Sequence, residues 1–390
     1  MTPSAVLAGE ALWAVLEGDC VTLDLPLGSL DAVVSDPPAG IGFMGKGWDH
    51  DKGGRDSWIA WMAERMRVAF ALLKPGGHAV IWALPRTSHW TATAIEDAGF
   101  EIRDVLTHHF GSGFPKSLDV SKAIDSAAGA VREVVGPPPY SRGKPSQQYS
   151  ETRKVSYDCE PQPITAPATP EAAQWEGWGT ALKPASEHWI LARKPLIGTV
   201  AANVLAHGTG GINVDACRVG SGEGLERHNK VGENGWCNSG GGPNRAAIRA
   251  ANGQDPLGRW PTNLLLSHSE GCNGVCMPDC PVGELDRQSV EGGIHGAGHA
   301  RDKIVESVSS GTSFNMGGTS NMRRLGDSGG ASRFFPTFRY VSKAPRSMRE
   351  AGLVAAEGER ANDHPTVKHD DLMRWLVRLV TPPGGVVLDM

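Results

Sequence analysis

The sequence predicts an α/β fold in which a parallel sheet is connected by right-handed crossovers. Within residues 1–135, short apolar runs alternate with longer segments whose apolar residues recur at helical spacing. The order strand, helix, strand, helix, strand is typical of a parallel sheet, because parallel neighbours need a crossover between them.

Each element of this first part has a local signal. Residues 31–36 (DAVVSD) form an apolar run that ends at a turn, so we expect a buried strand. Residues 57–73 have helical spacing, with Ser57 as the expected N-cap, and the sequence KPGG at 74–77 is expected to break that helix. The other elements expected here are a strand at 78–83, a helix at 86–98 ended by Gly99, and a strand at 100–110.

The rest of the chain is less regular. Its expected elements are strands at 187–193, 262–267 and 334–341, a helix at 370–380, and a strand beginning at 386–389. We divide the chain into a catalytic half (1–135), a Pro-rich linker or insert (136–185), a closing strand (186–200), a loop-rich target recognition region (201–345) and the start of a cofactor-binding half (346–390).

Composition limits the class of protein. The chain has 390 residues, 40% of them hydrophobic, and seven cysteines without a disulfide pattern, so a reduced cytoplasmic protein is expected. It shows neither a signal peptide nor an apolar run long enough for a membrane. The net charge of -5 gives no global support for nucleic-acid binding.

A basic stretch could nevertheless supply a local phosphate-binding surface. Residues 323–349 contain seven Lys or Arg and one Asp. The candidate contacts are Arg333, Arg339, Lys343 and Arg346. The alternative is an ordinary solvated basic face.

The tetrapeptide Asp36, Pro37, Pro38, Ala39 directly follows the first buried strand. Ligands of open parallel sheets bind outside the carboxyl ends of the strands. Two consecutive prolines remove two N–H donors, which leaves a stiff corner of carbonyl and carboxylate acceptors. Such a corner suits an incoming amine, although an Asp-capped turn that ends a strand has the same sequence.

An ordered set of segments resembles the DNA adenine-N6 and cytosine-N4 amino-methyltransferases in their β arrangement, in which the catalytic motif precedes the cofactor motif. The matching segments are 36–49, 73–78, 114–117, 191–195 and 364–368 followed by 372–389. The resemblance implies a Rossmann-like S-adenosylmethionine-dependent methyltransferase sheet with a large loop-rich insert.

The resemblance also implies roles for residues. Asp36 and the Pro37 carbonyl would accept the hydrogens of an amine on a flipped base of double-stranded DNA, with Pro38 stiffening the corner. An initial Asp favours adenine N6, whereas relatives acting on cytosine N4 often begin with Ser and those acting on protein glutamine begin with Asn. The cofactor S-adenosylmethionine would be held by His364, Thr366, Lys368 and Asp389.

Two positions depart from the family pattern. Ala39 stands where the family usually has an aromatic residue, and we hypothesise that Phe43 or Trp48 stacks on the base instead, unless both are packing residues. The strand at 386–389 is followed by Met390, whereas the family continues into a Phe-x-Gly-x-Gly cofactor loop. The sheet is therefore expected to be incomplete at the C-terminus. Either the chain is a truncated or split gene product, or a second chain supplies that loop, or the protein is catalytically inactive, and little or no activity is expected for this chain alone.

Three functional interpretations follow: a DNA methyltransferase of the restriction-modification kind, a DNA-binding remnant without catalysis, and an enzyme of similar chemistry that acts on RNA. A structure that locked Asp36 into an ion pair, with no open pocket beside it, would contradict the enzymatic interpretations.

A separate cluster could hold a metal. His268, Cys272, Cys276 and Cys280 offer four soft ligands, which is the number that structural zinc takes. Their x₃ spacing is unlike the common two-residue knuckles, and the alternative is buried free thiols. Cys217 and Cys237 could replace one of them.

Overall fold

The computed structural model describes residues 2–42, 47–111, 113, 117–137, 163–220, 258–269, 271–291, 330–339 and 367–390. The chain forms two compact units. One comprises Met1–Ser112 with Ala185–Met390, and the other is Gly113–Pro184.

The first unit is built on a mixed sheet, which has seven strands among the described residues, in the order β8-β7-β3-β6-β2-β1-β9. The strands are β1 (Leu30–Ser35), β2 (Leu73–Ala83), β3 (Glu101–His109), β6 (Ser186–Arg193), β7 (Leu264–Ser267), β8 (Thr337–Phe338) and β9 (Val387–Leu388). Every neighbouring pair is parallel except the two that involve β6, which runs antiparallel to β2 and β3.

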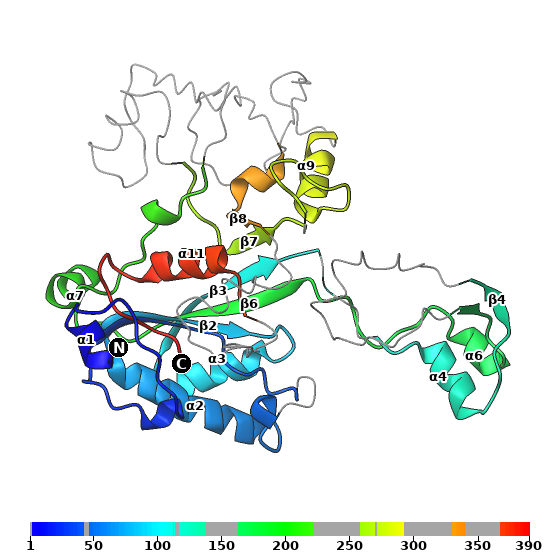
Figure 1. Cartoon of the computed structure of the whole chain (residues 1–390), viewed down its shortest axis with the longest axis horizontal. Helices are drawn as coiled ribbons and strands as arrows, with labels where there is room; N and C mark the ends of the chain where they lie inside the picture. The colour runs from blue at the N-terminus through cyan, green and yellow to red at the C-terminus, as the bar shows by residue number, and fades with distance from the viewer. Residues whose placement is uncertain are drawn as a thin grey trace, which may run out of the picture. The chain divides into compact units, whose positions relative to one another are not determined.

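Helices cover both faces of this sheet (Figure 1). On one face, α2 (Arg55–Leu72) and α3 (Ser88–Asp97) pack against the strands, and on the other lies α11 (Asp370–Val380). This double cover explains why all six residues of β1 are buried. No helix in the described ranges combines the length and apolar character needed to span a bilayer.

Shorter elements surround these layers. They are α1 (Pro3–Leu7), η1 (Cys20–Thr22), η3 (Gly47–Asp49), α7 (Val200–His207), η4 (Asp215–Cys217), α9 (Pro281–Glu291) and η5 (Ala331–Phe334).

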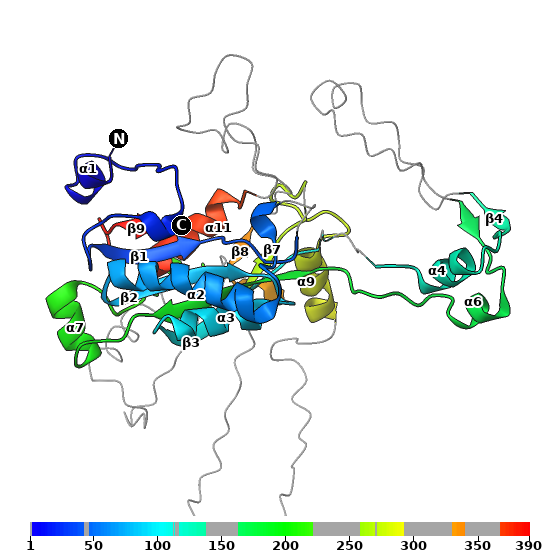
Figure 2. The same cartoon turned by 90° about the horizontal axis from the view of Figure 1, so that it is seen from below.

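A buried carboxylate ties β1 to both of its neighbours. Asp31 Oδ1 lies 2.6 Å from Lys74 Nζ at the start of β2, and Asp31 Oδ2 accepts a 2.8 Å hydrogen bond from the Val386 N–H beside β9. Figure 2 shows β9, near the C-terminal end, lying along β1. Asp31 thus fixes the position of the last strand of the sheet.

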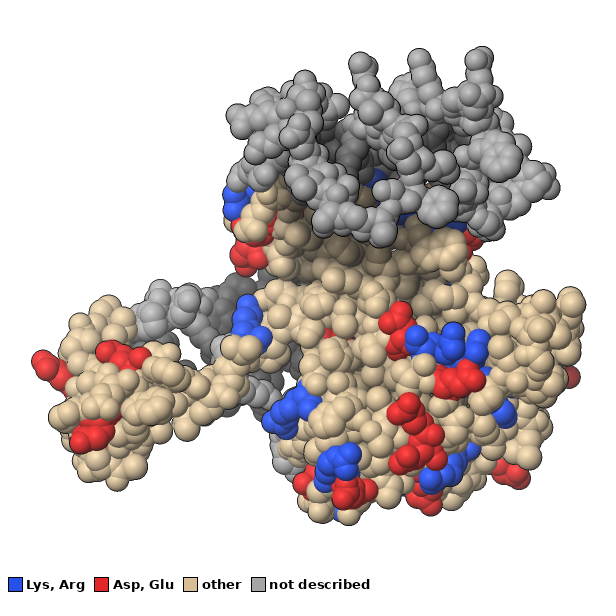
Figure 3. Space-filling view, turned by 180° about the vertical axis from the view of Figure 1, so that it is seen from behind, with Lys and Arg blue, Asp and Glu red and all other residues tan. Residues whose placement is uncertain are grey.

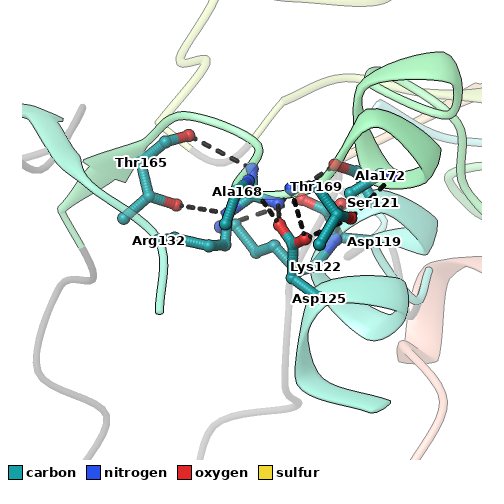
Figure 4. A network of polar contacts seen from close by, with 9 residues as sticks. All are labelled: Asp119, Ser121, Lys122, Asp125, Arg132, Thr165, Ala168, Thr169 and Ala172. Carbon is teal, nitrogen blue, oxygen red and sulfur yellow. Dashed lines mark hydrogen bonds and ion pairs between the residues drawn. The ribbon is translucent and has the colours of Figure 1, made fainter. Parts of the chain in front are cut away.

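The second unit contains α4 (Val120–Ala127), β4 (Val134–Gly136), β5 (Ile164–Thr165) and α6 (Pro170–Gln174). Its centre is the buried carboxylate of Asp125, which Figure 4 shows between the two helices and the strands. Asp125 Oδ2 lies 2.6 Å from Arg132 Nη1, and Asp125 Oδ1 accepts hydrogen bonds from the backbone and the hydroxyl of Thr169. Arg132 also binds Thr165, so one ion pair connects α4, β5 and the start of α6.

Each expected strand and helix has a counterpart in the same chain order, with local differences, and the structure adds elements that the sequence did not predict, among them α4, α7 and α9. The helix expected from Ser57 begins at Arg55 with Gly54 as its N-cap, which makes no side-chain capping bond, so the predicted cap was wrong. Residues 74–77 do not form a separate turn, because β2 already starts at Leu73. The chain also leaves the sheet unit at residue 113, ahead of the expected boundary at 135, and 163–184 form part of a packed unit.

The Rossmann-like α/β class is confirmed, but the sheet is mixed. The strand predicted at 187–193 is β6, and it enters between β2 and β3 in the antiparallel direction. A strand run does not contain its direction, so the sequence left this point open.

Candidate active site at the carboxyl edge of the sheet

The parallel strands end at one edge of the sheet, and the motif residues lie there. Asp36 directly follows β1, Trp82 lies near the end of β2, and His108 near the end of β3. Because β6 is antiparallel, its first residues reach the same edge, and Glu187 pairs in register with His108. Lys368 approaches this edge from the segment before α11.

Lys368 is the centre of the polar contacts at this edge. Its Nζ lies 3.5 Å from Asp36 Oδ2 and 3.1 Å from Glu187 Oε1. The same ammonium lies 4.2 Å from the centre of the Trp82 ring. Lys368 was expected on the cofactor side, and in the structure its ammonium lies beside the carboxylate of Asp36.

Asp36 therefore forms an ion pair, which was one of the two conditions expected to contradict an enzymatic function. The ion pair does not close Asp36 off from solvent. The Asp36 side chain keeps 25% of its surface exposed. Two hollows, of about 320 and 330 Å³, lie elsewhere: one on the surface of α2 and α3, the other between Arg218, His268 and Trp375. Asp36 is thus partly open to solvent and shares its carboxylate with Lys368, and neither of these two hollows lies beside it.

The two carboxyl groups beside Lys368 have very different proton affinities. Burial raises the pKa of Asp36 to about 6, Lys368 opposes the rise, and the charge of Glu187 adds to it. Burial also acts to raise the pKa of Glu187, but Lys368 and His108 outweigh it and bring that pKa to about 2. Glu187 is the carboxylate that stays ionised, and Asp36 is the one that titrates near neutrality.

The polar contacts continue across the sheet. His108 Nδ1 lies 3.7 Å from Glu187 Oε2, and His108 Nε2 lies 2.7 Å from Ser267 Oγ at the end of β7. A chain of charged and polar side chains thus links the motif carboxylate to β7.

The backbone after the double proline is fixed by close packing. Gly40 has φ +70°, and a Cβ at this position would lie 2.2 Å from Trp58 Nε1. The buried Asp49 carboxylate accepts a 2.9 Å hydrogen bond from Gly40 N–H, and the Asp49 carbonyl accepts one of 2.6 Å from Gly42 N–H. The residues around Ala39 therefore form a tight loop that packs against Trp58 of α2.

The candidate stacking residues remain predictions. Phe43 lies outside the described residues. Trp48 lies in η3, beside Asp49, and is 41% exposed. It is thus on the surface of the loop that follows the motif.

Of the four cofactor-side candidates, the structure describes Lys368 and Asp389. His364 and Thr366 lie outside the described residues. Asp389 follows β9, next to β1, and its Oδ1 accepts a 2.8 Å hydrogen bond from Ser35 Oγ. Asp389 therefore lies beside the end of β1, close enough for its charge to act on Asp36.

Of the DNA-binding candidates, Lys343 and Arg346 lie outside the described residues. The Arg333 guanidinium bonds to the Gly330 carbonyl and stacks 4.4 Å from the ring centre of Phe334. Arg339 Nη2 donates a 2.9 Å hydrogen bond to Asn273 Oδ1. On the face shown in Figure 3, the described Lys and Arg are interspersed with Asp and Glu.

The four metal-ligand candidates do come together. One ligand atom from each of His268, Cys272, Cys276 and Cys280 lies within 4.8 Å of every other. Cys217 is instead buried against α11, where its Sγ contacts the Trp375 carbonyl at 3.8 Å, so it does not replace any of them. Cys237 lies outside the described residues.

Sequence reasoning missed Glu187, His108 and Trp82 as site residues. Glu187 begins a correctly predicted strand, but only the antiparallel insertion of β6 brings it to this edge. A charged residue at the start of a buried strand was the one available signal.

No protein-family model matches the chain, and no curated protein sequence matches it. Solved structures do resemble it in part. A putative DNA modification methylase from Thermus thermophilus is 16% identical over 46% of this chain and 51% of its own, with a TM-score of 0.24. M1.HpyAVI in its complex with SAM is 14% identical over 43% of this chain and 45% of its own, with a TM-score of 0.19. The cyclase SpnF is 12% identical over 46% and 55%, with a TM-score of 0.20. The chain thus spans about half the length of the structures it resembles.

Proposed function

We propose that this chain is a DNA methyltransferase that moves a methyl group from S-adenosylmethionine to the N6 amine of adenine. The observation that carries the proposal is the position of Asp36, a partly exposed carboxylate after two prolines at the carboxyl edge of a doubly covered sheet. The ordered resemblance of the surrounding segments to amino-methyltransferases supports it.

For methyl transfer, the main task of the protein would be to position the amine against the methyl group. Asp36 and the Pro37 carbonyl would each accept one hydrogen of the amine, which turns the nitrogen lone pair toward the methyl carbon. The new N–C bond would form as the S–C bond breaks. The methylated nitrogen would then be positively charged and would have to lose one proton. A carboxylate whose pKa is about 6 can take that proton and release it again near neutral pH.

The residues present fit the charge of the donor. S-adenosylmethionine supplies a methyl group on a positively charged sulfur, and it also carries an ammonium group. Among the described residues, Asp36, Glu187 and Asp389 place three carboxyl groups at this edge, near the ammonium of Lys368. We assign Asp389 to the donor side and Asp36 to the amine.

The target amine of a paired base lies within the stack, so the base must swing out to reach Asp36. We propose that Trp48, or Phe43, replaces the aromatic residue absent at Ala39. A duplex with a fluorescent adenine analogue tests this, since Trp48→Ala should weaken base extrusion while Trp13→Ala, another exposed tryptophan at 43%, should not. Equal extrusion in both variants would remove Trp48 from the site.

The finer features of the activity are part of this proposal. The substrate would be double-stranded DNA in the cytoplasm, methylated as by the modification half of a restriction-modification pair. Cytosine N4 is the second candidate target, because the same acceptors fit its amine. A second chain as partner, and a remnant that binds DNA without catalysis, are the competing interpretations of the same residues.

The test is transfer of a radiolabelled methyl group to plasmid DNA or to RNA, followed by nucleoside analysis. We expect N6-methyladenine in DNA, and loss of the label with Asp36→Asn but not with the exposed-surface control Asp24→Asn. Label in cytosine or in RNA would correct the substrate. Absence of transfer together with tight binding of DNA would favour the remnant, and donor-binding titration would then decide whether the cofactor side is functional.

A further inference from the structure

We propose that His268, Cys272, Cys276 and Cys280 bind a structural zinc ion that fixes β7, α9 and β8 to one another. This inference does not depend on the proposed methyl transfer.

The first support is the ligand geometry. Zinc bonds to sulfur at about 2.3 Å and to nitrogen at about 2.0 Å, so a tetrahedral site separates sulfur from nitrogen ligands by roughly 3.6 Å. His268 Nδ1 lies 3.4 Å from Cys276 Sγ and 3.5 Å from Cys280 Sγ. These spacings, with all four ligand atoms within 4.8 Å of one another, leave room for one such ion.

The second support is that the backbone is arranged to receive thiolates. The Met277 N–H donates to Cys272 Sγ at 3.2 Å, and the Ser269 N–H donates to Cys280 Sγ at 3.4 Å. Gly283 in α9 packs so closely that a Cβ there would lie 2.7 Å from Cys276 Cβ. The loop is therefore folded around the sulfur atoms.

The third support is the exposure of two apolar side chains in this loop. Val275 is 80% exposed and Met277 is 44% exposed, whereas Cys280 is buried. Burial of Val275 and Met277 therefore contributes little to the stability of the loop, and a bound metal would add a cross-link between its residues.

The position of the cluster indicates a structural role. Four protein ligands fill the coordination sphere of zinc and leave no open position for substrate. In the sheet order, β7 is separated from β1 by β3, β6 and β2, which is four strand spacings or about 19 Å. The ion could not act on a group held at Asp36.

The site connects three elements. His268 follows β7 and its N–H donates to the Phe338 carbonyl of β8, while Cys280 immediately precedes α9. In α9, Asp286 accepts hydrogen bonds from both the backbone and the hydroxyl of Ser332 in η5. The ligand loop also holds Arg339 through Asn273.

Elemental analysis of the full chain, purified under reducing conditions, should find about one zinc per chain. X-ray absorption at the zinc edge should fit three sulfurs at about 2.3 Å and one nitrogen at about 2.0 Å. Substitution by cobalt should give the visible spectrum of a tetrahedral thiolate site. These three measurements need no variant, so they remain valid whatever a substitution does to folding.

Variants then assign the ligands. Cys272→Ser and Cys276→Ser should each lower zinc affinity by at least about tenfold, whereas Cys20→Ser should leave it unchanged because Cys20 lies outside the cluster. A chain that stays free of zinc after reconstitution, or an absorption fit without sulfur, overturns the proposal. Equal zinc loss in the Cys20 variant would do the same.

Discussion

Asp36 and Glu187 bind the same ammonium, that of Lys368, yet their carboxyl groups lose their protons about four pH units apart, at about 6 and about 2. Burial acts to raise both pKa values. For Glu187 it is outweighed by Lys368 and His108, whereas the negative charge of Glu187 raises the pKa of Asp36 further. The site therefore holds one permanent carboxylate and one that changes state near neutral pH.

The pH dependence of methyl transfer should report this difference. The reaction needs the Asp36 carboxylate, so the rate should fall about tenfold per pH unit below about 6. Lys368→Met removes the charge that lowers the pKa of Asp36 and should move the midpoint to higher pH. Glu187→Gln removes the charge that raises it and should move the midpoint to lower pH. If the midpoints of the Lys368 and Glu187 variants shift in the same direction, Asp36 does not control the pH dependence of the rate. A shift of the midpoint in the control variant Asp24→Asn would show the same.

The packing of Gly40 on Trp58 gives a second prediction. Gly40 and Gly42 both have positive φ, at +70° and +64°, but among the described residues an added Cβ would meet a neighbour within 4 Å at Gly40 and not at Gly42. Gly42→Ala should cost about 1 kcal/mol of folding free energy from backbone strain alone. Gly40→Ala should cost more and should also displace the Asp36 loop, which would abolish transfer. Urea denaturation and activity, measured on both variants, separate the two effects, and Trp58→Leu should partly restore the Gly40 variant.

Asp31 should stabilise the sheet through its two partners. Asp31→Ala leaves the Lys74 ammonium and the Val386 N–H without their acceptor, so we expect a loss of about 3 kcal/mol. Lys74→Met should cost less, because the Asp31 carboxylate keeps the Val386 bond. If Asp31→Ala is no more harmful than Asp24→Ala in a urea titration, the carboxylate does not hold β9 to β1.

His78 should make the fold sensitive to acid. Burial, with the charges of Arg193 and Arg103, lowers the pKa of His78 from 6.5 to about 4. The unfolded chain therefore takes up the proton first as the pH falls. Stability from the neutral imidazole is complete above 6.5 and is lost progressively down to about 4, by up to about 3 kcal/mol. His78→Leu should lose less stability than the unchanged chain between pH 7 and pH 4.5. Parallel urea curves for the two chains across that range would rule this out.

Much of the fold follows from residues near in sequence. The apolar run at 31–36 and the helical spacing at 370–380 gave β1 and α11 at nearly their observed bounds. These elements are buried on the faces that their patterns indicate, because periodicity reflects which side chains must leave water. The place of Asp36 at the end of a buried strand was fixed in the same way.

Other features were decided by the tertiary structure alone. The direction of β6 depends on pairing with β2 and β3, and it brings Glu187 to within 3.1 Å of Lys368, which is 181 residues away in the chain. The sequence determined which residues offer acceptors, charges and sulfur ligands, because those are properties of the residues themselves. Which carboxylates contact the same ammonium, and which ligands can bind the same ion, depends on distances of a few ångströms between segments far apart in the chain. Only the packing of the sheet sets those distances.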